Sequence, residues 1–278
     1  MNIHNNKLLN IESLITEYNL GTSLTKLEIK YRISRKVLSR LFRERSVNIR
    51  QDNKIHIYNE TYFNEIDTEE KAYWLGFLYA DGWVSRDSHQ FSLCLKSSDI
   101  LHLVKFRDII TPTGKIMQKN VKLGDKIFSA HTFGGCNGPL RNTLVAKGCT
   151  PRKSLTLQFP NSQIVPNNLR KHFIRGYFDG DGSVSRNCKI GGLFAIIASF
   201  TGTRDFLDSL QNVLIEEIPN YTIVSVRKDS RSKCFFISKG GKNAPMALLK
   251  YLYDGCSVCL ERKRDKYLSA FAVLSSNA

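Results

Sequence analysis

The chain lacks any hydrophobic run long enough to cross a membrane. Its longest nearly unbroken apolar stretch extends from Leu193 to Phe200, whereas a membrane helix needs about 20 apolar residues. The N-terminus, MNIHNNKLLN, also lacks the apolar core of a secretory signal peptide. We therefore expect a protein with no membrane partner that is not secreted. It would work in the cytoplasm or, if it is organellar or phage-encoded, in the corresponding intracellular compartment.

Several common catalytic and metal-binding patterns are absent as well. The seven cysteines are odd in number and scattered, which does not suggest a disulfide framework. Cys256 and Cys259 form a CxxC, but no second pair or nearby histidine completes a zinc site. The six histidines form no HExxH, and no Walker loop occurs. An acidic run that begins at Asp179 has Val184 and Ile190 where a calcium loop needs Gly and Glu.

Basic residues, by contrast, are abundant. The 278 residues include 41 Lys and Arg against 25 Asp and Glu, which gives a formal charge of +16, and 42% of the chain is hydrophobic. Such a composition indicates a folded protein whose first expected partner is a polyanion, above all nucleic acid.

The first fifty residues have a helical hydrophobic pattern of their own. Apolar residues recur at helical spacing from Ile11 to about Arg50, and they predict three short helices with Ser23 and Ser34 at N-cap positions. The last of these helices carries the basic residues Arg35, Lys36, Arg40, Arg43 and Arg45. We interpret residues 1–50 as a helix-turn-helix-like DNA-binding domain, with a generic three-helix bundle as the alternative. Residues 51–66 are mixed in character and are assigned as a linker.

The rest of the chain contains an internal repeat. WLGFLYADGWVSR, which begins at Trp74, aligns without a gap to IRGYFDGDGSVSR, which begins at Ile174. Farther on, GGCNGP matches GGKNAP, and each is followed by an apolar helix that ends in Gly-Cys. We assign residues 67–160 to a first repeat and residues 161–278 to a second.

Each repeat shows the same order of signals: helix, two strands, helix, two strands, helix. In the first, alternation from Phe91 to Leu95 predicts a strand, Ser98 to Ile110 a helix, and Gly124-Asp125 a hairpin turn. The second gives a strand over 193–200, a helix over 203–215 and a hairpin over 221–239. The fold class is therefore α+β, with two related units behind a small all-α domain.

Both repeats open with an apolar helix that runs into an acidic residue and a glycine. Thr68 is expected to cap the first helix and Asn167 the second. Small residues four apart would allow the two helices to approach closely. The packing residues are Gly76 and Ala80 in the first helix and Gly176 and Gly180 in the second, and we expect Gly82 and Gly182 to end the helices in the left-handed conformation.

This packing would bring Asp81 and Asp181 together at one end of the helix pair. Two carboxylates at helix C-termini repel each other and also face the negative ends of both helix dipoles. A divalent cation removes the conflict, and hard oxygen ligands suit Mg²⁺ or another divalent ion. Metal there could activate water and stabilise both oxygens of a phosphodiester displacement. Two centres related by pseudo-symmetry would suit the two strands of a duplex.

The runs from Trp74 to Gly82 and from Ile174 to Gly182 resemble the two motif copies of single-chain LAGLIDADG homing endonucleases. The likeness covers about residues 67–278. It implies two αββαββα units that form a saddle of antiparallel sheets over DNA, with paired acids that cut both strands. The departures are Trp74 and Ile174 for the leading leucine and Tyr79 for the first aspartate.

The resemblance also supplies site assignments. It places the metal at Asp81 and Asp181 with the neighbouring Ala80 and Gly180, and basic residues near the end of the fourth strand would assist it. In the second repeat these are Lys239 and Lys242, whereas the aligned residues of the first repeat are Phe133 and Cys136.

We expect DNA contacts from the sheet faces and hairpins as well as from the N-terminal domain. The candidates are Arg35, Lys36, Arg40, Arg86, Lys96, Lys119, Lys122, Lys126, Arg186, Arg227, Lys228, Arg231 and Lys233. The resulting interpretation is a monomeric, metal-dependent, sequence-specific double-strand DNA endonuclease. The alternatives are an intron maturase, whose partner is intron RNA, and a non-cleaving DNA-binding regulator.

Overall fold

The computed structural model describes residues 11–49, 57–190, 193–230 and 232–275. Two compact units make up the chain, residues 1–55 and residues 56–278, and each is described by itself. No helix within the described ranges is both long and apolar enough to span a membrane.

The first unit consists of three short helices around a small apolar core. They are α1 (Ile11–Asn19), α2 (Leu24–Tyr31) and α3 (Arg35–Glu44). The side chain of Ser23 accepts a hydrogen bond from the N–H of Lys26, and that of Ser34 accepts one from the N–H of Val37, so both predicted N-caps are present. The buried residues are Leu14, Tyr18, Leu27, Leu38 and Phe42. Whether this unit binds DNA stays a prediction.

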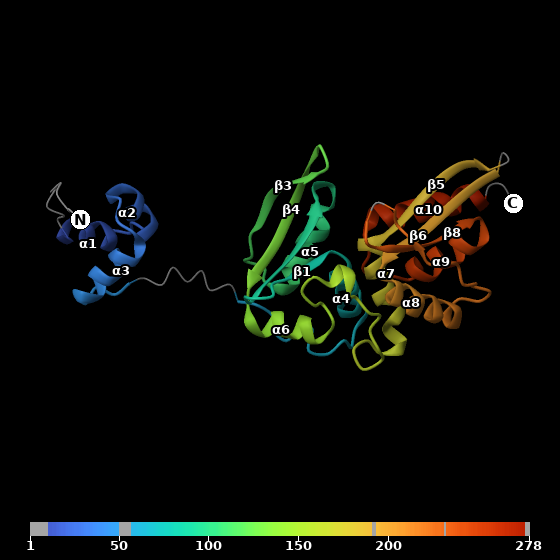
Figure 1. Ribbon diagram of the computed structural model, residues 1–278, viewed down its shortest axis with the longest axis horizontal. Helices are drawn as coiled ribbons and strands as arrows, with labels where there is room; N and C mark the ends of the chain where they lie inside the picture. Colours follow the sequence, from blue (N-terminus) through green and yellow to red (C-terminus); the bar gives the residue numbers. More distant parts are fainter. Residues whose placement is uncertain (1–10, 50–56, 191–192, 231, 276–278) are drawn as a thin grey trace. The chain divides into compact units, whose positions relative to one another are not determined.

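The first repeat forms a four-stranded antiparallel sheet in the order β1-β2-β4-β3 (Figure 1). Its predicted hairpin is confirmed, because β3 pairs with β4 from Ile116 opposite Phe133 to Leu123 opposite Lys126. The elements are α4 (Glu69–Asp81), β1 (Gly82–Val84), β2 (Gln90–Lys96), η1 (Ser97–Asp99), α5 (Ile100–Ile110), β3 (Ile116–Leu123), β4 (Lys126–Cys136), α6 (Gly138–Ala146) and η2 (Lys153–Leu155).

The second repeat has the same topology, with the sheet order β5-β6-β8-β7. Its last hairpin is much shorter than that of the first repeat, since β7 contains only two residues. The elements are η3 (Asn167–Leu169), α7 (Arg170–Asp181), β5 (Gly182–Ile190), β6 (Leu193–Gly202), α8 (Arg204–Glu217), β7 (Arg227–Lys228), β8 (Phe235–Gly241), α9 (Asn243–Tyr253) and α10 (Glu261–Ser275). The two related α+β units predicted from the sequence are therefore confirmed.

Helices α4 and α7 pack against each other at the centre of the second unit, and the glycines make this possible. A Cβ added at Gly76 would lie 2.0 Å from the carbonyl oxygen of Phe173, and one added at Gly176 would lie 1.9 Å from that of Tyr73. No side chain fits at such distances, so the backbones touch directly. The close approach expected from the small residues is present.

Two local expectations about these helices were wrong. Gly82 and Gly182 do not adopt the left-handed conformation; their φ angles are −71° and −90°, and each begins a strand directly after the helix. A Cβ would lie 2.5 Å from the Leu78 carbonyl oxygen at Gly82 and 2.3 Å from the Phe178 ring at Gly182, so close packing requires these glycines. Asn167 does not cap α7, because a short 3₁₀ turn precedes the helix and the Asn167 side chain accepts from Arg170 instead.

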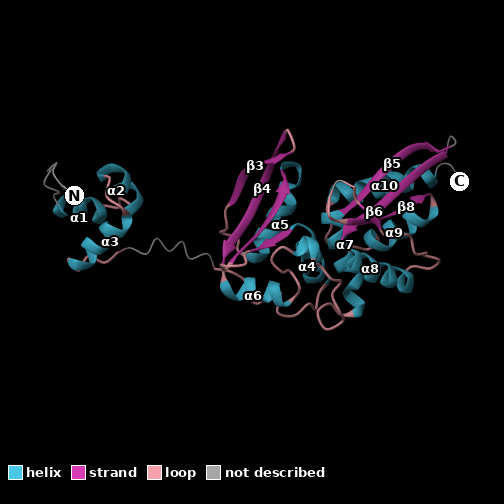
Figure 2. Cartoon of the chain, viewed as in Figure 1, coloured by secondary structure: helices cyan, strands magenta, loops and turns pink. Residues whose placement is uncertain are grey.

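Each sheet has helices packed on one face (Figure 2). In the first repeat Phe91, Leu93 and Leu95 of β2 are buried on the face that meets α5, and the residues between them lie on the other face. In the second repeat Ile196, Ala198 and Phe200 of β6 are buried in the same way. The opposite face of each sheet is referred to below as its uncovered face.

Candidate active site and nucleic-acid interface

The helix pair brings the two motif carboxylates together. Asp81 ends α4 and Asp181 ends α7. The two helix ends are in contact, since a Cβ added at Gly180 would lie 2.3 Å from the Cβ of Ala80 and 3.3 Å from Oδ2 of Asp81. Asp81 is exposed to solvent at its helix end, and Asp181 is half-buried. The two acids thus lie at neighbouring helix ends between the repeats.

Both carboxyl groups are held in an environment that disfavours their charge. Burial and then the neighbouring charge of Asp181 raise the pKa of Asp81 to about 7, and burial also raises the pKa of Asp181. Among the contacts of the described residues, neither carboxylate makes a hydrogen bond or an ion pair. A pair of this kind has unused acceptor capacity.

Two lysines approach these helix ends from equivalent places in the two repeats. The Lys153 ammonium donates to the carbonyl oxygens of Ala80 at 3.0 Å and Gly82 at 2.6 Å. That of Lys263 donates to the carbonyl oxygens of Phe178 at 2.6 Å and Gly182 at 2.5 Å. Burial lowers the pKa of both lysines, to about 8 for Lys263, while the motif carboxylates act in the opposite direction. Each helix end therefore has an acid and an ammonium group beside it.

The lysines predicted to assist the site lie elsewhere. Lys239 on β8 donates to the side-chain oxygen of Thr222 at 2.6 Å and lies 4.8 Å from the centre of the Tyr221 ring. It pairs with Ala198 on the covered face of the sheet, and Lys242 is exposed at the start of α9. None of the described contacts joins either lysine to the acids. Their catalytic role stays a prediction, and the geometry favours Lys153 and Lys263 instead.

Sequence reasoning placed neither Lys153 nor Lys263 at the active site. The signal that could have found them is a basic residue after the Gly-Cys that closes each repeat. The spacing hides the match, because Lys153 comes four residues after Cys149 whereas Lys263 comes seven residues after Cys256. An ungapped comparison does not align them.

The two helix ends fit a hard divalent cation. Among the described contacts their two carboxylates make no ion pair, and the Ala80 and Gly180 carbonyls lie on the same helix ends. The Ala80 carbonyl oxygen already accepts from Lys153, which leaves one lone pair free. Oxygen donors with room for water and phosphate are what Mg²⁺ prefers. The described residues contain no group of three or more His, Cys, Asp or Glu side chains that could hold a metal, so any ion here would depend on carbonyls, water or phosphate.

The uncovered face of the first sheet is basic and partly apolar. Strand register places Lys96 and Lys119 opposite Ala130 and Lys126 opposite Leu123, which puts all three lysines on this face. Trp83, Met117 and Phe128 lie on it too, and they are 51%, 60% and 48% exposed. Lys122 belongs to the other face but is exposed near the hairpin tip, and Arg86 is exposed beyond β1.

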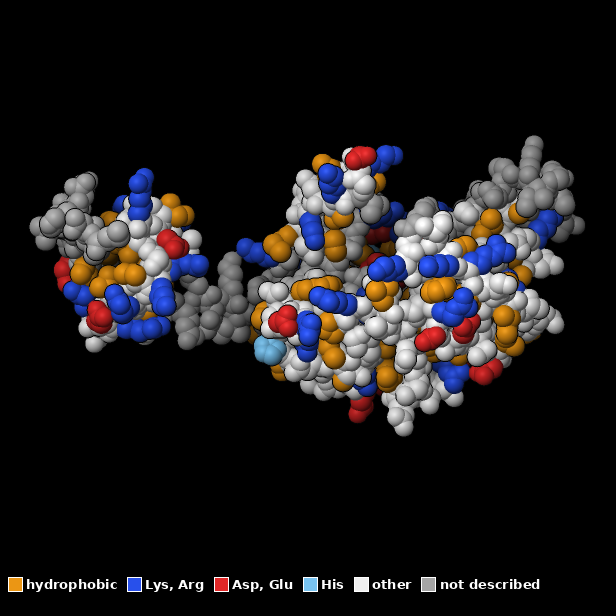
Figure 3. Space-filling view, in the orientation of Figure 1, with side chains coloured by type: hydrophobic (Ala, Val, Ile, Leu, Met, Phe, Trp, Pro, Cys, Tyr) orange, Lys and Arg blue, Asp and Glu red, His pale blue; other side chains and the backbone are white. Residues whose placement is uncertain are grey.

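The remaining candidates for DNA contact are distributed over the second repeat and the first unit. Arg227, Lys228 and Lys233 are exposed on the short hairpin. Arg231 and the side chain of Arg186 lie outside the described residues. In the first unit Lys36 and Arg40 are exposed on α3, and Arg35 forms an ion pair with Glu28 at 3.1 Å. Lys and Arg side chains occur across the visible surface of the second unit (Figure 3).

Comparison with known proteins agrees with this architecture. Residues 168–235 match the family described as a LAGLIDADG-like domain. The matched residues lie within the second repeat. A lysine-to-alanine mutant of I-SmaMI matches with a TM-score of 0.50 at 13% identity, over 74% of this chain and 92% of that chain. A double lysine-to-alanine mutant gives 0.50 at 12%, with the same coverage. I-GzeII in complex with its DNA target gives 0.49 at 9%, over 74% and 91%. Curated protein sequences give no match.

The LAGLIDADG fold explains the layout of the second unit. I-SmaMI is described as a LAGLIDADG homing endonuclease, and this chain shares its fold with both motif helices in one polypeptide. The motif departures sit in the core: Trp74 and Ile174 are both fully buried, and the hydroxyl of Tyr79 donates to the carbonyl oxygen of Lys147. The departures therefore leave the acids at the helix ends undisturbed.

Proposed function

We propose that the protein is a sequence-specific double-strand DNA endonuclease that depends on Mg²⁺ or a similar ion. The observation that carries this proposal is the junction where the ends of α4 and α7 meet. It holds Asp81 and Asp181 without partners among the described contacts, with Lys153 and Lys263 beside them. The LAGLIDADG-like domain and the fold shared with I-SmaMI support the same conclusion. Because one chain contains both motifs, a monomer suffices.

We assign the following roles in phosphodiester hydrolysis to the residues of this chain. Asp81 and Asp181 would bind the ions through their carboxylate oxygens, which are the hard ligands that Mg²⁺ prefers. When bound, the ions supply an activated water and stabilise the oxygens of the scissile phosphate. The ammonium groups of Lys153 and Lys263 stabilise negative charge that develops on the phosphate at each centre. Their hydrogen bonds to helix-end carbonyls hold them there before DNA arrives.

The two uncovered sheet faces would bind the duplex on either side of the cut. Lys96, Lys119 and Lys126 neutralise phosphates along the first half-site, and Arg227 does so along the second. The first unit would lengthen the footprint through Lys36 and Arg40 of α3. If so, alanine at both positions weakens binding to a long site about tenfold and leaves binding to the core site unchanged.

The test is cleavage of a randomised duplex DNA library with Mg²⁺. Wild-type protein should enrich one long site cut on both strands. Asp81→Asn and Asp181→Asn should still bind that site but lose cleavage of one or both strands by at least about a thousandfold. Tight binding to DNA or to intron RNA without any cutting would overturn the endonuclease and favour the regulator or the maturase.

A further inference from the structure

The segment that carries Lys263 to the active site is longer than its counterpart in the first repeat. In the first repeat the Gly-Cys of residues 148 and 149 is followed almost at once by Lys153. In the second repeat, residues 254–260 join α9 to α10, and Lys263 lies in the first turn of α10. The longer linker must be fixed by other contacts if Lys263 is to stay at the helix end.

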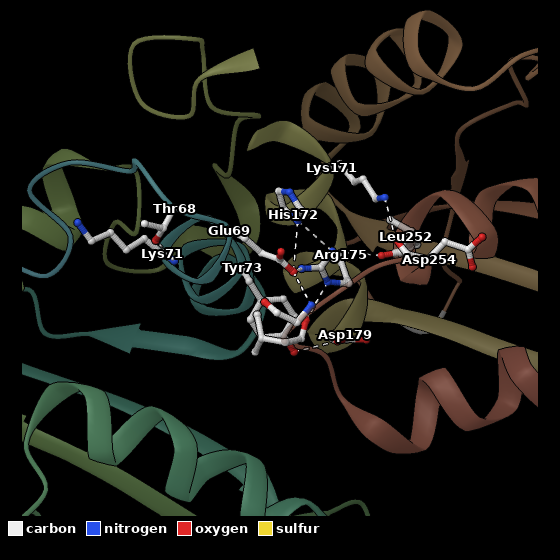
Figure 4. Close-up of polar contacts among 12 residues, drawn as sticks. Thr68, Glu69, Lys71, Tyr73, Lys171, His172, Arg175, Asp179, Leu252 and Asp254 are labelled. Carbon is white, nitrogen blue, oxygen red and sulfur yellow. Dashed lines mark hydrogen bonds and ion pairs between the residues drawn. The ribbon is translucent and has the colours of Figure 1, made fainter. Parts of the chain in front are cut away.

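A buried ion pair supplies the first of these contacts (Figure 4). Arg175 on α7 is fully buried, and its guanidinium donates to the Glu69 carboxylate at 2.6 Å. It also donates to the carbonyl oxygens of Leu252 at 3.2 Å and Val258 at 2.9 Å. Glu69 accepts the N–H of Ser257 at 2.8 Å. The pair therefore binds the last turn of α9 and the middle of the linker.

Glu69 lies in the first turn of α4, so this contact crosses from one repeat to the other. Burial acts to raise the pKa of Glu69, but the Ser257 N–H and the Arg175 charge outweigh it and lower that pKa. The carboxylate is thus held in its charged form against the linker. A buried guanidinium that lost this partner would be left uncompensated.

A second buried acid binds the end of the linker. Asp179 accepts the N–H of Leu260 at 2.6 Å and the hydroxyl of Tyr253 at 2.6 Å. It also accepts the hydroxyl of Tyr73, which belongs to α4 of the first repeat, at 2.8 Å. Leu260 immediately precedes α10, so Asp179 determines where the helix that carries Lys263 begins.

The first repeat has no such arrangement. The residues aligned with Arg175 and Asp179 are Leu75 and Tyr79. Leu75 is fully buried, and Tyr79 reaches its own shorter linker directly through the hydrogen bond to the Lys147 carbonyl oxygen. The position of Lys153 is therefore set within one repeat, whereas that of Lys263 is set by side chains from both.

We propose that Glu69, Arg175 and Asp179 are positioning residues that hold Lys263 at the end of α7, and that one of the two strand cuts therefore depends on the other repeat. The inference deepens the proposed endonuclease function and rests on it. If the network only joined the repeats, its loss would lower stability without singling out Lys263.

The first experiment does not need nuclease activity. Glu69→Gln keeps the shape of the side chain and removes its charge, and Glu70→Gln, an exposed position in the same helical turn, is the matched control. Each folded protein is acetylated with N-hydroxysuccinimidyl acetate at less than one label per chain, and Lys153 and Lys263 are quantified by mass spectrometry. We expect Lys263 to react about tenfold faster in Glu69→Gln, as local opening exposes it, with Lys153 unchanged and Glu70→Gln like the wild type. An equal rise at both lysines, or none at Lys263, overturns the proposal.

The second experiment resolves the two strands of the cognate duplex, each with its own end label. Lys153→Met and Lys263→Met identify the strand that each lysine serves. Glu69→Gln should slow the Lys263 strand by about tenfold and the other strand hardly at all, and Tyr79→Phe should slow the Lys153 strand instead. Equal slowing of both strands overturns the positioning role. If the wild type cuts neither strand, the endonuclease proposal fails. The acetylation result still decides whether Glu69 helps to hold Lys263 in place.

Discussion

The two repeats share one topology but offer different chemistry on their uncovered faces. The first presents lysines interleaved with exposed apolar side chains on a long hairpin, whereas the second presents a row of hydroxyl groups beside the half-buried Phe236 and a short hairpin. The first set is Trp83, Lys96, Met117, Lys119, Lys126 and Phe128, and the second is Ser183, Ser199, Thr201, Arg227 and Ser238. Apolar side chains can contact thymine methyl groups, and hydroxyls can pair with several base edges. One scaffold therefore suits a DNA site whose two halves differ.

The two repeats are more alike where helices α4 and α7 pack together than they are on their sheet faces. Gly76 and Gly176 face each other's backbone in equivalent ways, and Lys153 and Lys263 both donate to the glycine that follows the motif acid, Gly82 in one repeat and Gly182 in the other. The packing of the two helices thus keeps a symmetry that the outer surfaces have lost, although the contacts that hold the two lysines differ.

The largest effect should come from breaking the symmetric helix contact. Gly76→Ala or Gly176→Ala puts a methyl group about 2 Å from a backbone carbonyl oxygen, and we expect each to cost at least about 3 kcal/mol, because the helices must move apart. Gly240→Ala is the control, since the nearest neighbour of its added Cβ would be a side-chain atom of Ile197 at 3.9 Å. Denaturant unfolding measures all three. If either helix glycine tolerates alanine as Gly240 does, the close contact is absent in solution.

This contact was also the part of the structure most open to prediction. Small residues four apart, repeated at an offset of 100, specify both the helix face and its partner. The ends of the same helices were predicted less well. A glycine after a helix suggests that the helix ends in the left-handed conformation. Gly82 is needed for another reason: a Cβ there would collide with the Leu78 carbonyl oxygen. The sequence does not reveal this close contact.

Next in size is the effect of removing either ammonium group. Lys153→Met and Lys263→Met should each slow one strand cut by about a hundredfold to a thousandfold, and the two variants should affect opposite strands. Single-turnover nicking of an end-labelled duplex gives the two rates. If each variant slowed both strand cuts equally, the two lysines would serve a single shared centre. The assignment of one lysine to each strand would then be wrong.

These lysines escaped sequence reasoning because the two linkers differ in length. Lys239 and Lys242 seemed better placed, since they follow the fourth strand, but strand alternation puts Lys239 on the covered face. Side-chain direction on a strand can be predicted only when its register is known, and this strand has few alternating residues.

A smaller effect on folding stability, which depends on pH, should distinguish helix α5 of the first repeat from helix α8 of the second. Helix α5 packs His102 against α4, with its Nε2 2.9 Å from the Tyr73 hydroxyl, whereas α8 has no histidine. Burial lowers the pKa of His102 from 6.5 to about 4. Between these values the unfolded chain binds a proton that the folded protein does not, so folding stability is full above pH 6.5 and falls as the pH drops toward 4.

This loss amounts to up to about 3 kcal/mol across the window. His102→Gln should remove it, so the stability of the wild type relative to the variant should decline from pH 7 to pH 4.5. Guanidinium unfolding at several pH values measures this difference. Parallel curves for the two proteins would mean that His102 is protonated in the folded state.

The smallest effects should distinguish the two kinds of side chain on the first uncovered face. Lys119→Ala removes one phosphate contact, so the slope of log affinity against log salt should fall by about 0.9 and all sequences should weaken alike. Arg227→Ala should do the same from the second repeat, because both act through charge. Phe128→Ala should leave the slope unchanged and relax base preference in the first half-site alone, since an apolar contact reads a base edge and not the backbone. Affinity measured over a salt series, on DNA with single-base changes in each half-site, separates these cases. Two results would contradict this division: a change in base preference from Lys119→Ala, or a change in salt slope from Phe128→Ala. Either would mean that lysines do not act only on phosphates and apolar side chains do not act only on bases. The two repeats would then differ in the shape of their DNA-binding faces and not in how those faces recognise DNA.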